Sequence, residues 1–472
     1  MYVRFPAMST DEKLATLTPI GWSQVSLSPD EALGILAPDN YPLEFWLEMW
    51  GGEPVYRIVD WDDVDRAVSA IDGREIRDVM PERALQVVQH NLSAPAASLD
   101  RSYLRSDQWT VTGYWDELRP FHVIALNDPR DTHYYVAIDT GEIVLDTARW
   151  ERFWNYLGAI PHWIYFEFIR FDTDKWFWLI IVVSGIGIVS ATSGLWLGIS
   201  RLRLRKRYGG VNVTPFRGWM KWHHITGILG GVFLFAWIVT GLLTMYPGGF
   251  LEQREVTRAE LEQYAGNTRP QFNLAGRDGL IAAGATAKTA HFIWLAGRPL
   301  IILNQGAHDA LIADGLTGSF EAISDNDLYV AAQLLMPESK LVLAERIIDG
   351  DEYWHTGFTV KKLPVLRIGF DDEANTWFHI DPASGQVIGI LDDVGRLDRW
   401  VNSGVHNIDL AFLFKNRPLW DIIVWILMLA GLFVSVSALV IGTKRLSFTV
   451  SSAKRRRAIA NRSSDTSKEI MT

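Results

Sequence analysis

The chain has 472 residues, of which 48% are hydrophobic and 21 are tryptophan, and its formal net charge is −10. This length allows several domains, and the acidic balance argues against nucleic acid as a partner. Cysteine is absent, which excludes disulfides, thiolate metal clusters and the covalent attachment of a c-type haem. Any cofactor must therefore be held non-covalently.

The first 175 residues alternate apolar and polar side chains between turn residues. Residues 53–58 form one such run, and residues 135–144 form two runs around Asp139 and Gly141. An Asp or Gly between two alternating runs is typical of a tight β-hairpin turn. Residues 29–36 lie outside these runs and have helical spacing. Similar runs occupy residues 298–302 and 378–388, so we expect two α+β domains, each with a small antiparallel sheet.

Three long apolar runs occupy residues 176–197, 223–245 and 419–441, and Asp421 is the one charged side chain among them. At about 1.5 Å per residue, each helix would cross roughly 30 Å of hydrocarbon. Tryptophan lies near their ends, as interfacial anchors do. The alternative is three buried helices of a large soluble core, but apolar runs of this length favour membrane spans.

Two basic segments decide the expected topology. One follows the first span and the other follows the third. Their basic residues are Arg201, Arg203, Arg205, Lys206, Arg207, Arg217 and Lys221, and then Lys444, Arg445, Lys454, Arg455, Arg456, Arg457 and Arg462. The positive-inside rule places both segments in the cytoplasm and the rest of the hydrophilic chain outside it. Contacts with anionic lipid explain these clusters better than nucleic-acid binding does.

Residues 107–180 recur 244 positions later, which indicates two copies of one structural unit. The identical pairs are Asp107/Asp351, Thr112/Thr356, Gly113/Gly357, Pro120/Pro364, Asp128/Asp372, Thr132/Thr376, Gly141/Gly385, His162/His406, Phe168/Phe412 and Trp176/Trp420. A complete unit consists of a span, an outer domain, a histidine and a second span. Because Met1 aligns with Met245, at the end of a span, we expect that the first unit has lost its opening span. The alternative is a genuine three-span protein.

Four histidines lie at the expected membrane boundaries. His162 and His406 each precede the tryptophan of the next span by 14 residues, and His223 and His224 open the middle span. An ionisable group at a membrane span is costly and marks a functional site by default. Imidazole is a good ligand for iron, and Gly227, on the same helical face as His223, leaves room for a flat macrocycle. The alternative is that these histidines only cap helix ends.

Six other histidines of the outer domains do not recur as histidine in the repeat. We interpret them as surface or sheet residues. They are His122, His133, His291, His308, His355 and His379.

With these features the chain resembles the PepSY-associated transmembrane proteins of bacteria, some of which act as inner-membrane ferric-siderophore reductases. The matching residues are the run W-H-H-I-T-G-I-L-G-G-V-F-L-F-A-W-I-V-T-G-L-L at 222–243, the hairpins at 138–144 and 380–388, and the histidines before two spans. The resemblance implies four spans and b-type haem held between histidines. It makes His223 a better ligand than His224, because the family's H-x-x-x-G pattern matches His223 and Gly227. A partner of His223 would then be missing from these residues.

We therefore predict an α-helical polytopic membrane protein with two α+β periplasmic PepSY-like domains, built as a tandem repeat whose first span is absent. The expected location is the bacterial cytoplasmic membrane. The expected segments are a PepSY-like domain at 1–161, a histidine segment and span at 162–200, a basic cytoplasmic loop at 201–221, a span at 222–246, a second PepSY-like domain at 247–405, a histidine segment and span at 406–442, and a basic tail at 443–472.

The expected function is haem-dependent electron transfer across the membrane to a periplasmic ferric chelate such as a ferric siderophore. His162 and His406 would be the axial ligands of an outer haem b, and His223, with His224 beside it, would belong to an inner haem. Bis-histidine ligation suits electron transfer. No nicotinamide or flavin motif occurs, so electrons would come from a cytoplasmic donor or a quinol. The rival hypothesis is a non-enzymatic PepSY membrane protein that binds a peptide or regulates an exported protease.

Overall fold

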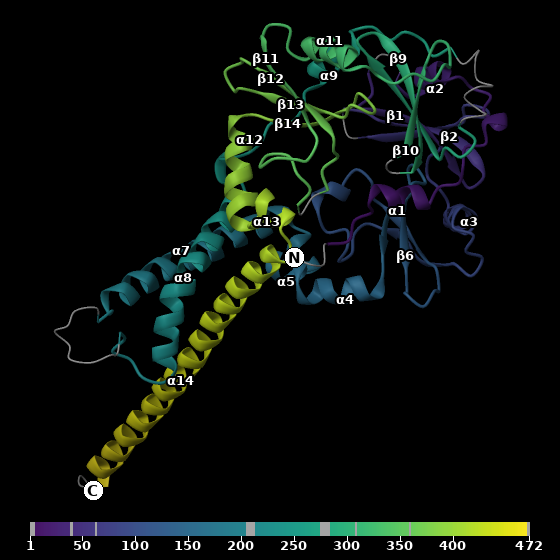
Figure 1. Ribbon diagram of the computed structural model, residues 1–472. Helices are drawn as coiled ribbons and strands as arrows, with labels where there is room; N and C mark the ends of the chain where they lie inside the picture. Colours follow the sequence, from purple (N-terminus) through teal and green to yellow (C-terminus); the bar gives the residue numbers. More distant parts are fainter. Residues whose placement is uncertain are drawn as a thin grey trace. The chain divides into compact units, whose positions relative to one another are not determined.

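The computed structural model describes residues 5–37, 41–61, 64–203, 213–273, 284–306, 309–357 and 360–469. The chain divides into two compact units. The first unit consists of Met1–Trp178, Gln253–Asp349 and Lys362–Val394 and contains the sheets. The second consists of Leu179–Glu252, Gly350–Lys361 and Gly395–Thr472 and contains most of the long helices (Figure 1).

A six-stranded antiparallel sheet receives three strands from each repeat. They are β1 (Glu44–Trp50), β2 (Glu53–Val59) and β3 (Asp65–Ser69), then β8 (Thr289–Leu295), β9 (Arg298–Gly306) and β10 (Asp309–Asp314). The order is β10-β9-β8-β1-β2-β3, and β1 pairs with β8 so that Trp46 faces His291. Phe45, Leu47 and Phe292 point to the other face and form an apolar core. This alternation of polar and apolar faces is the period-2 pattern of the sequence.

Two further sheets are copies of each other. The first has the order β4-β5-β6-β7 and the second β11-β12-β13-β14. Their strands are β4 (Ser98–Leu104), β5 (Phe121–Ala125), β6 (His133–Ala137) and β7 (Ile143–Thr147), then β11 (Leu341–Ile347), β12 (Val365–Phe370), β13 (Trp377–Ile380) and β14 (Val387–Leu391). Helices α3 (Pro81–Asn91) and α11 (Asp325–Leu335) are also offset by 244 positions.

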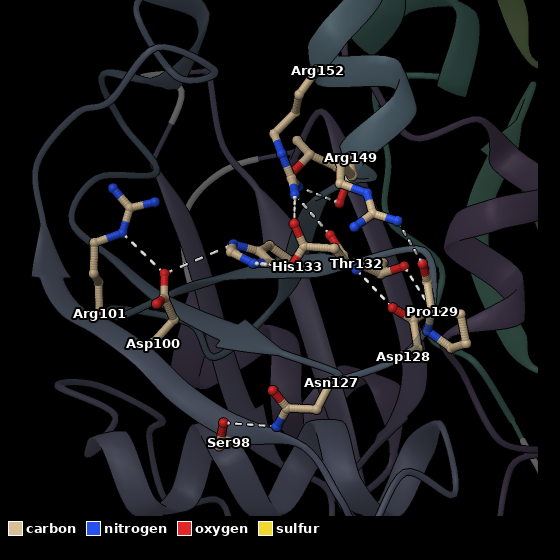
Figure 2. A network of polar contacts seen from close by, with 12 residues as sticks. Ser98, Asp100, Arg101, Asn127, Asp128, Pro129, Thr132, His133, Arg149 and Arg152 are labelled. Atoms are coloured by element: carbon tan, nitrogen blue, oxygen red, sulfur yellow. Dashed lines mark hydrogen bonds and ion pairs between the residues drawn. The ribbon is translucent and has the colours of Figure 1, made fainter.

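A polar turn recurs with the same bonds in both of these sheets. The Asp128 carboxylate accepts from the Thr132 backbone and hydroxyl at 2.8 and 2.9 Å. Asp372 accepts from Thr376 in the same way at 2.7 and 2.8 Å. Figure 2 shows the first copy. A side chain that satisfies local backbone donors stabilises a turn, which explains why these residues are identical in the two repeats.

The first unit also contains several short helices before, between and after its strands. They are α1 (Thr10–Ala15), η1 (Trp22–Gln24), α2 (Pro29–Leu36), η2 (Gly113–Trp115), α4 (Arg149–Leu157), α5 (Ala159–Trp163), α6 (Glu167–Arg170) and α9 (Arg258–Ala265). Helix α2 coincides with the helix expected at 29–36 and begins with a capping box, in which Ser28 and Glu31 bond each other's backbone.

Within the described part of the chain, three helices are long and apolar enough to cross a membrane: α7 (Thr173–Ser200), α8 (Trp219–Leu243) and the Leu419–Lys454 part of α14 (Leu419–Glu469). In the chain, η4 (Pro247–Gly249) follows α8, and α12 (Asp393–Asp398), the π-helix η6 (Arg399–His406) and α13 (Ala411–Lys415) precede α14. Gly230 lets α8 approach α14 closely, since a Cβ there would lie 3.3 Å from that of Ala430. Small residues at such a crossing favour close helix packing.

The fold class predicted from the sequence is wrong. The chain is not an α-helical polytopic protein with two separate α+β domains, because 21% of it is strand and 42% helix, in three antiparallel sheets beside the three apolar helices. The pairing of β1 with β8 merges strands of both repeats into one sheet. An edge strand has unpaired backbone N–H and C=O groups. The pairing of β1 with β8 satisfies these groups on one edge of each repeat's three strands.

Some sequence predictions concern residues outside the described part of the chain. These residues are Met1, Tyr2, Arg205, Lys206, Arg207 and His308, together with the side chains of residues 455–472. The predictions about the first span, the basic segments and His308 therefore stay predictions.

Candidate functional site

His406 ends η6 and lies beside the C-terminal end of α8. Its Nδ1 is 3.0 Å from the Thr240 hydroxyl, which donates its own proton to the Ala236 carbonyl at 2.8 Å. With that proton directed to Ala236, we assign Nδ1 of His406 as the donor in this contact, which puts the lone pair of the neutral ring on Nε2. Gly241 permits this approach, since a Cβ there would lie 3.2 Å from the imidazole.

His223 has the same arrangement at the N-terminal end of α8. Its Nδ1 is 2.9 Å from the hydroxyl of Ser437 on α14. Ser437 is fully buried and donates to the Val434 carbonyl at 2.9 Å. We therefore assign Nδ1 of His223 as the donor and the lone pair of the neutral ring to Nε2. A Cβ added at Gly227 would meet nothing within 4 Å. That this space beside His223 takes a flat macrocycle stays a prediction.

His224 is held in a different way. Its Nε2 donates to the Gly198 carbonyl of α7 at 2.8 Å, and the ring of Phe216 meets it edge-on at 5.1 Å. The side chain is buried, and its Nδ1 has no hydrogen-bond partner among the described residues. His224 thus joins α8 to α7, whereas its neighbour His223 contacts α14.

His223 and His406 contact opposite ends of α8, one through its own position and the other through Thr240. Residues 223 and 240 are 17 positions apart, which corresponds to about 26 Å at about 1.5 Å per residue. Two ligands of one iron must lie within about 4 Å of each other. His223 and His406 therefore belong to different sites.

His162 lies in α5 of the first unit, whereas the other three predicted ligands lie in the second unit. The side chain is exposed, yet partial desolvation by the surrounding protein lowers the pKa of His162. The lower pKa favours neutral imidazole, the form that binds metals. The pairing of His162 with His406 stays a prediction.

A buried histidine–carboxylate pair joins Asp409, which follows His406 closely in the chain, to the distant His355, and the sequence reasoning missed it. His355 Nε2 is 2.7 Å from Asp409, and Arg399 donates to the Asp409 carbonyl at 2.6 Å. Gly357 is required here, because any Cβ would collide with the Asp409 carboxylate. In the first repeat the equivalent positions are Val111 and Tyr165. A search for recurring histidines therefore could not find this pair.

Four other histidines of the expected outer domains lie in strands, and His90 lies in α3. The four are His122 in β5, His133 in β6, His291 in β8 and His379 in β13. His122 donates to the Val79 carbonyl, and His379 accepts from Arg367 at 3.0 Å. Among the described residues, no group of three or more His, Asp and Glu side chains is arranged to hold a metal ion.

A cavity of about 390 Å³ lies against the polar face of the six-stranded sheet. Trp46, Glu48 and His291 line it, and burial lowers the pKa of His291 to about 4. Glu48 accepts from Arg57 at 2.6 Å and from the Trp46 indole at 2.9 Å. The buried charge of Glu48 is thereby neutralised within the protein, as buried charges must be.

Comparison with known proteins identifies the family. A family model, the PepSY-associated TM region, matches residues 65–357. The chain belongs to the PepSY-associated TM family. The matched part of this PepSY-associated protein includes α7 and α8 with His162, His223 and His224, while His406 lies beyond it. No curated protein and no solved structure matches the chain.

Proposed function

We propose that this PepSY-associated protein carries electrons across the bacterial cytoplasmic membrane to a ferric chelate outside it, with b-type haem as its cofactor. One observation carries the proposal. Two imidazoles, His223 and His406, lie near opposite ends of one membrane-length helix, and in each a hydroxyl accepts from Nδ1 and leaves the lone pair on Nε2. A metal-bound histidine typically binds the metal through one ring nitrogen and donates a hydrogen bond from the other.

The residues at both positions fit an axial ligand. Ser437 and Thr240 hold the rings and select the tautomer that binds through Nε2. Gly227 leaves open space one turn from His223, and Gly241 lets the His406 ring lie against α8. When bound, haem supplies a reversible one-electron carrier. His162 would be the second ligand of the His406 site, because the repeat makes these two residues equivalent.

The membrane arrangement that we propose follows from the three apolar helices and the basic segments beside them. The protein would cross the membrane several times, with the sheets in the periplasm and the basic segments in the cytoplasm. The acceptor would be a ferric siderophore, and the donor would be a quinol or a cytoplasmic reductant.

The experiment is an absorption spectrum of the purified protein, reduced minus oxidised, from cells supplied with a haem precursor. We expect a low-spin b-type component that His406→Ala removes and His223→Ala leaves in place, because the two residues belong to different sites. His133→Ala is the matched control, because His133 lies in β6 and contacts Asp100 and Asp131 in the first unit (Figure 2). A colourless protein would contradict the proposal and favour the peptide-binding alternative.

A further inference from the structure

The segment between the last strand of each repeat and the next apolar helix exposes apolar side chains at equivalent positions. In α4, Trp150, Phe153, Trp154 and Leu157 are all exposed, and their i, i+3, i+4, i+7 spacing puts them on one helical face. In the second repeat, the residues 244 positions after Trp150, Phe153 and Tyr156 are also apolar and exposed. They are Val394, Leu397 and Trp400.

The opposite side of α4 is fixed to the sheet, so the apolar face cannot turn inward. Arg152 donates to the Thr147 hydroxyl at 2.8 Å and to Asp131 at 2.6 Å (Figure 2). The first backbone N–H of α4 bonds the Arg130 carbonyl at 3.0 Å. The second repeat repeats this backbone bond, from Asp393 to the Ala374 carbonyl at 3.0 Å.

An exposed phenylalanine is identical in the two repeats. Phe168 in α6 is 83% exposed, and its equivalent, Phe412 in α13, is 55% exposed. Each lies a few residues before an apolar helix, α7 or α14. Neither side chain is buried in its own unit, so the protein core does not explain why both copies have phenylalanine here.

The two faces are both mainly apolar but differ in their residues, since Trp154 and Leu157 correspond to the buried Asp398 and to Val401. Trp150 corresponds to Val394 and Phe153 to Leu397, so a protein partner that fits one face would not fit the other. A lipid surface requires only apolar and aromatic side chains at the right depth. In the second repeat the same positions stay exposed even though η6 packs against α8 through His406 and Thr240. The contact with α8 therefore does not cover the apolar face of the second repeat.

We propose that these two faces lie in the lipid headgroup region of the bilayer, as an interfacial belt. The belt consists of Trp150, Phe153, Trp154, Leu157 and Phe168 in the first repeat, and Val394, Leu397, Trp400 and Phe412 in the second. Aromatic residues concentrate at this depth in membrane proteins. The belt rests on the apolar helices crossing a membrane and is independent of the haem.

Site-specific labelling tests the belt directly, because the chain has no cysteine of its own. Phe153→Cys, Phe168→Cys and Leu397→Cys each give one bimane site in the full-length protein. The matched controls are Tyr103→Cys on β4 and Val342→Cys on β11, which are also exposed. The labelled proteins are placed in phosphatidylcholine vesicles whose acyl chains carry bromine near the headgroup.

We expect the brominated lipid to quench the belt positions at least about twofold more strongly than the controls, as interfacial residues require. Iodide in the water should quench the controls more strongly. Equal quenching by brominated lipid at belt and control positions would overturn the proposal. Protection from iodide without lipid quenching would indicate a protein partner and would also overturn it. Lipid quenching in one repeat alone would overturn the equivalence of the two faces.

Discussion

Replacing Thr240 by valine tests how the imidazole of His406 is held. The Thr240 hydroxyl accepts from His406 Nδ1 at 3.0 Å and donates to the Ala236 carbonyl at 2.8 Å. Valine has nearly the same shape but no acceptor, so the Nδ1 proton loses its partner. A lost hydrogen bond of this kind costs about 0.5–1.5 kcal/mol. Loss of the outer partner of a metal-bound histidine typically weakens metal binding by about 10–100-fold.

The assay is a haem titration of the cofactor-free protein in detergent, followed by the Soret absorbance. We expect Thr240→Val to raise the Kd of one haem by about tenfold, which corresponds to roughly 1.4 kcal/mol. Thr244→Val is the matched control, because Thr244 lies one turn later and donates to the Gly241 carbonyl at 2.7 Å. A Kd that is unchanged in Thr240→Val, or raised equally in Thr244→Val, would refute the assignment of Thr240.

Two further predictions concern a membrane-helix contact and a buried carboxyl group. His224→Phe should lower the unfolding temperature of the purified protein without changing its haem spectrum. The loss of the hydrogen bond to Gly198 costs roughly 1–3 kcal/mol. A changed haem spectrum would instead make His224 a ligand. Burial, with the charge of Glu142 as a smaller cause, raises the pKa of Asp65 to about 7. The folded protein therefore favours the protonated Asp65 carboxyl more than the unfolded chain does. The stability that this protonation contributes is lost as the pH rises through 7. Asp65→Asn should unfold at a higher temperature than the unmodified protein at pH 8, with a difference that shrinks towards pH 4; a difference independent of pH would contradict this.

Local regularities of the sequence determined a large part of the structure. The 244-residue offset predicted copied elements, and the sheets β4–β7 and β11–β14 are such copies. The identical Asp–Thr pairs mark the same turn in each. Length and composition were enough to find the three apolar helices. The turns and the apolar helices depend on residues close together in the chain, so the sequence pattern predicts them.

The candidate site was accessible to the sequence only in part. The repeat and the H-x-x-x-G spacing singled out His223 and His406, but not the groups that hold them. Ser437 is 214 positions from His223, and Thr240 is 166 positions from His406. No periodicity connects residues so far apart. The choice of ring nitrogen therefore depends on how α8 packs against its neighbours.

The pairing of the two repeats was decided by the tertiary structure alone. A repeat implies that each copy can form its own sheet, and the sequence accordingly predicted two separate domains. In the fold, β1 and β8 pair and make one sheet of six strands. The backbone groups that pair along these edges are the same in every residue. The side-chain pattern therefore does not predict which two strand edges pair. The packing of the whole unit decides it.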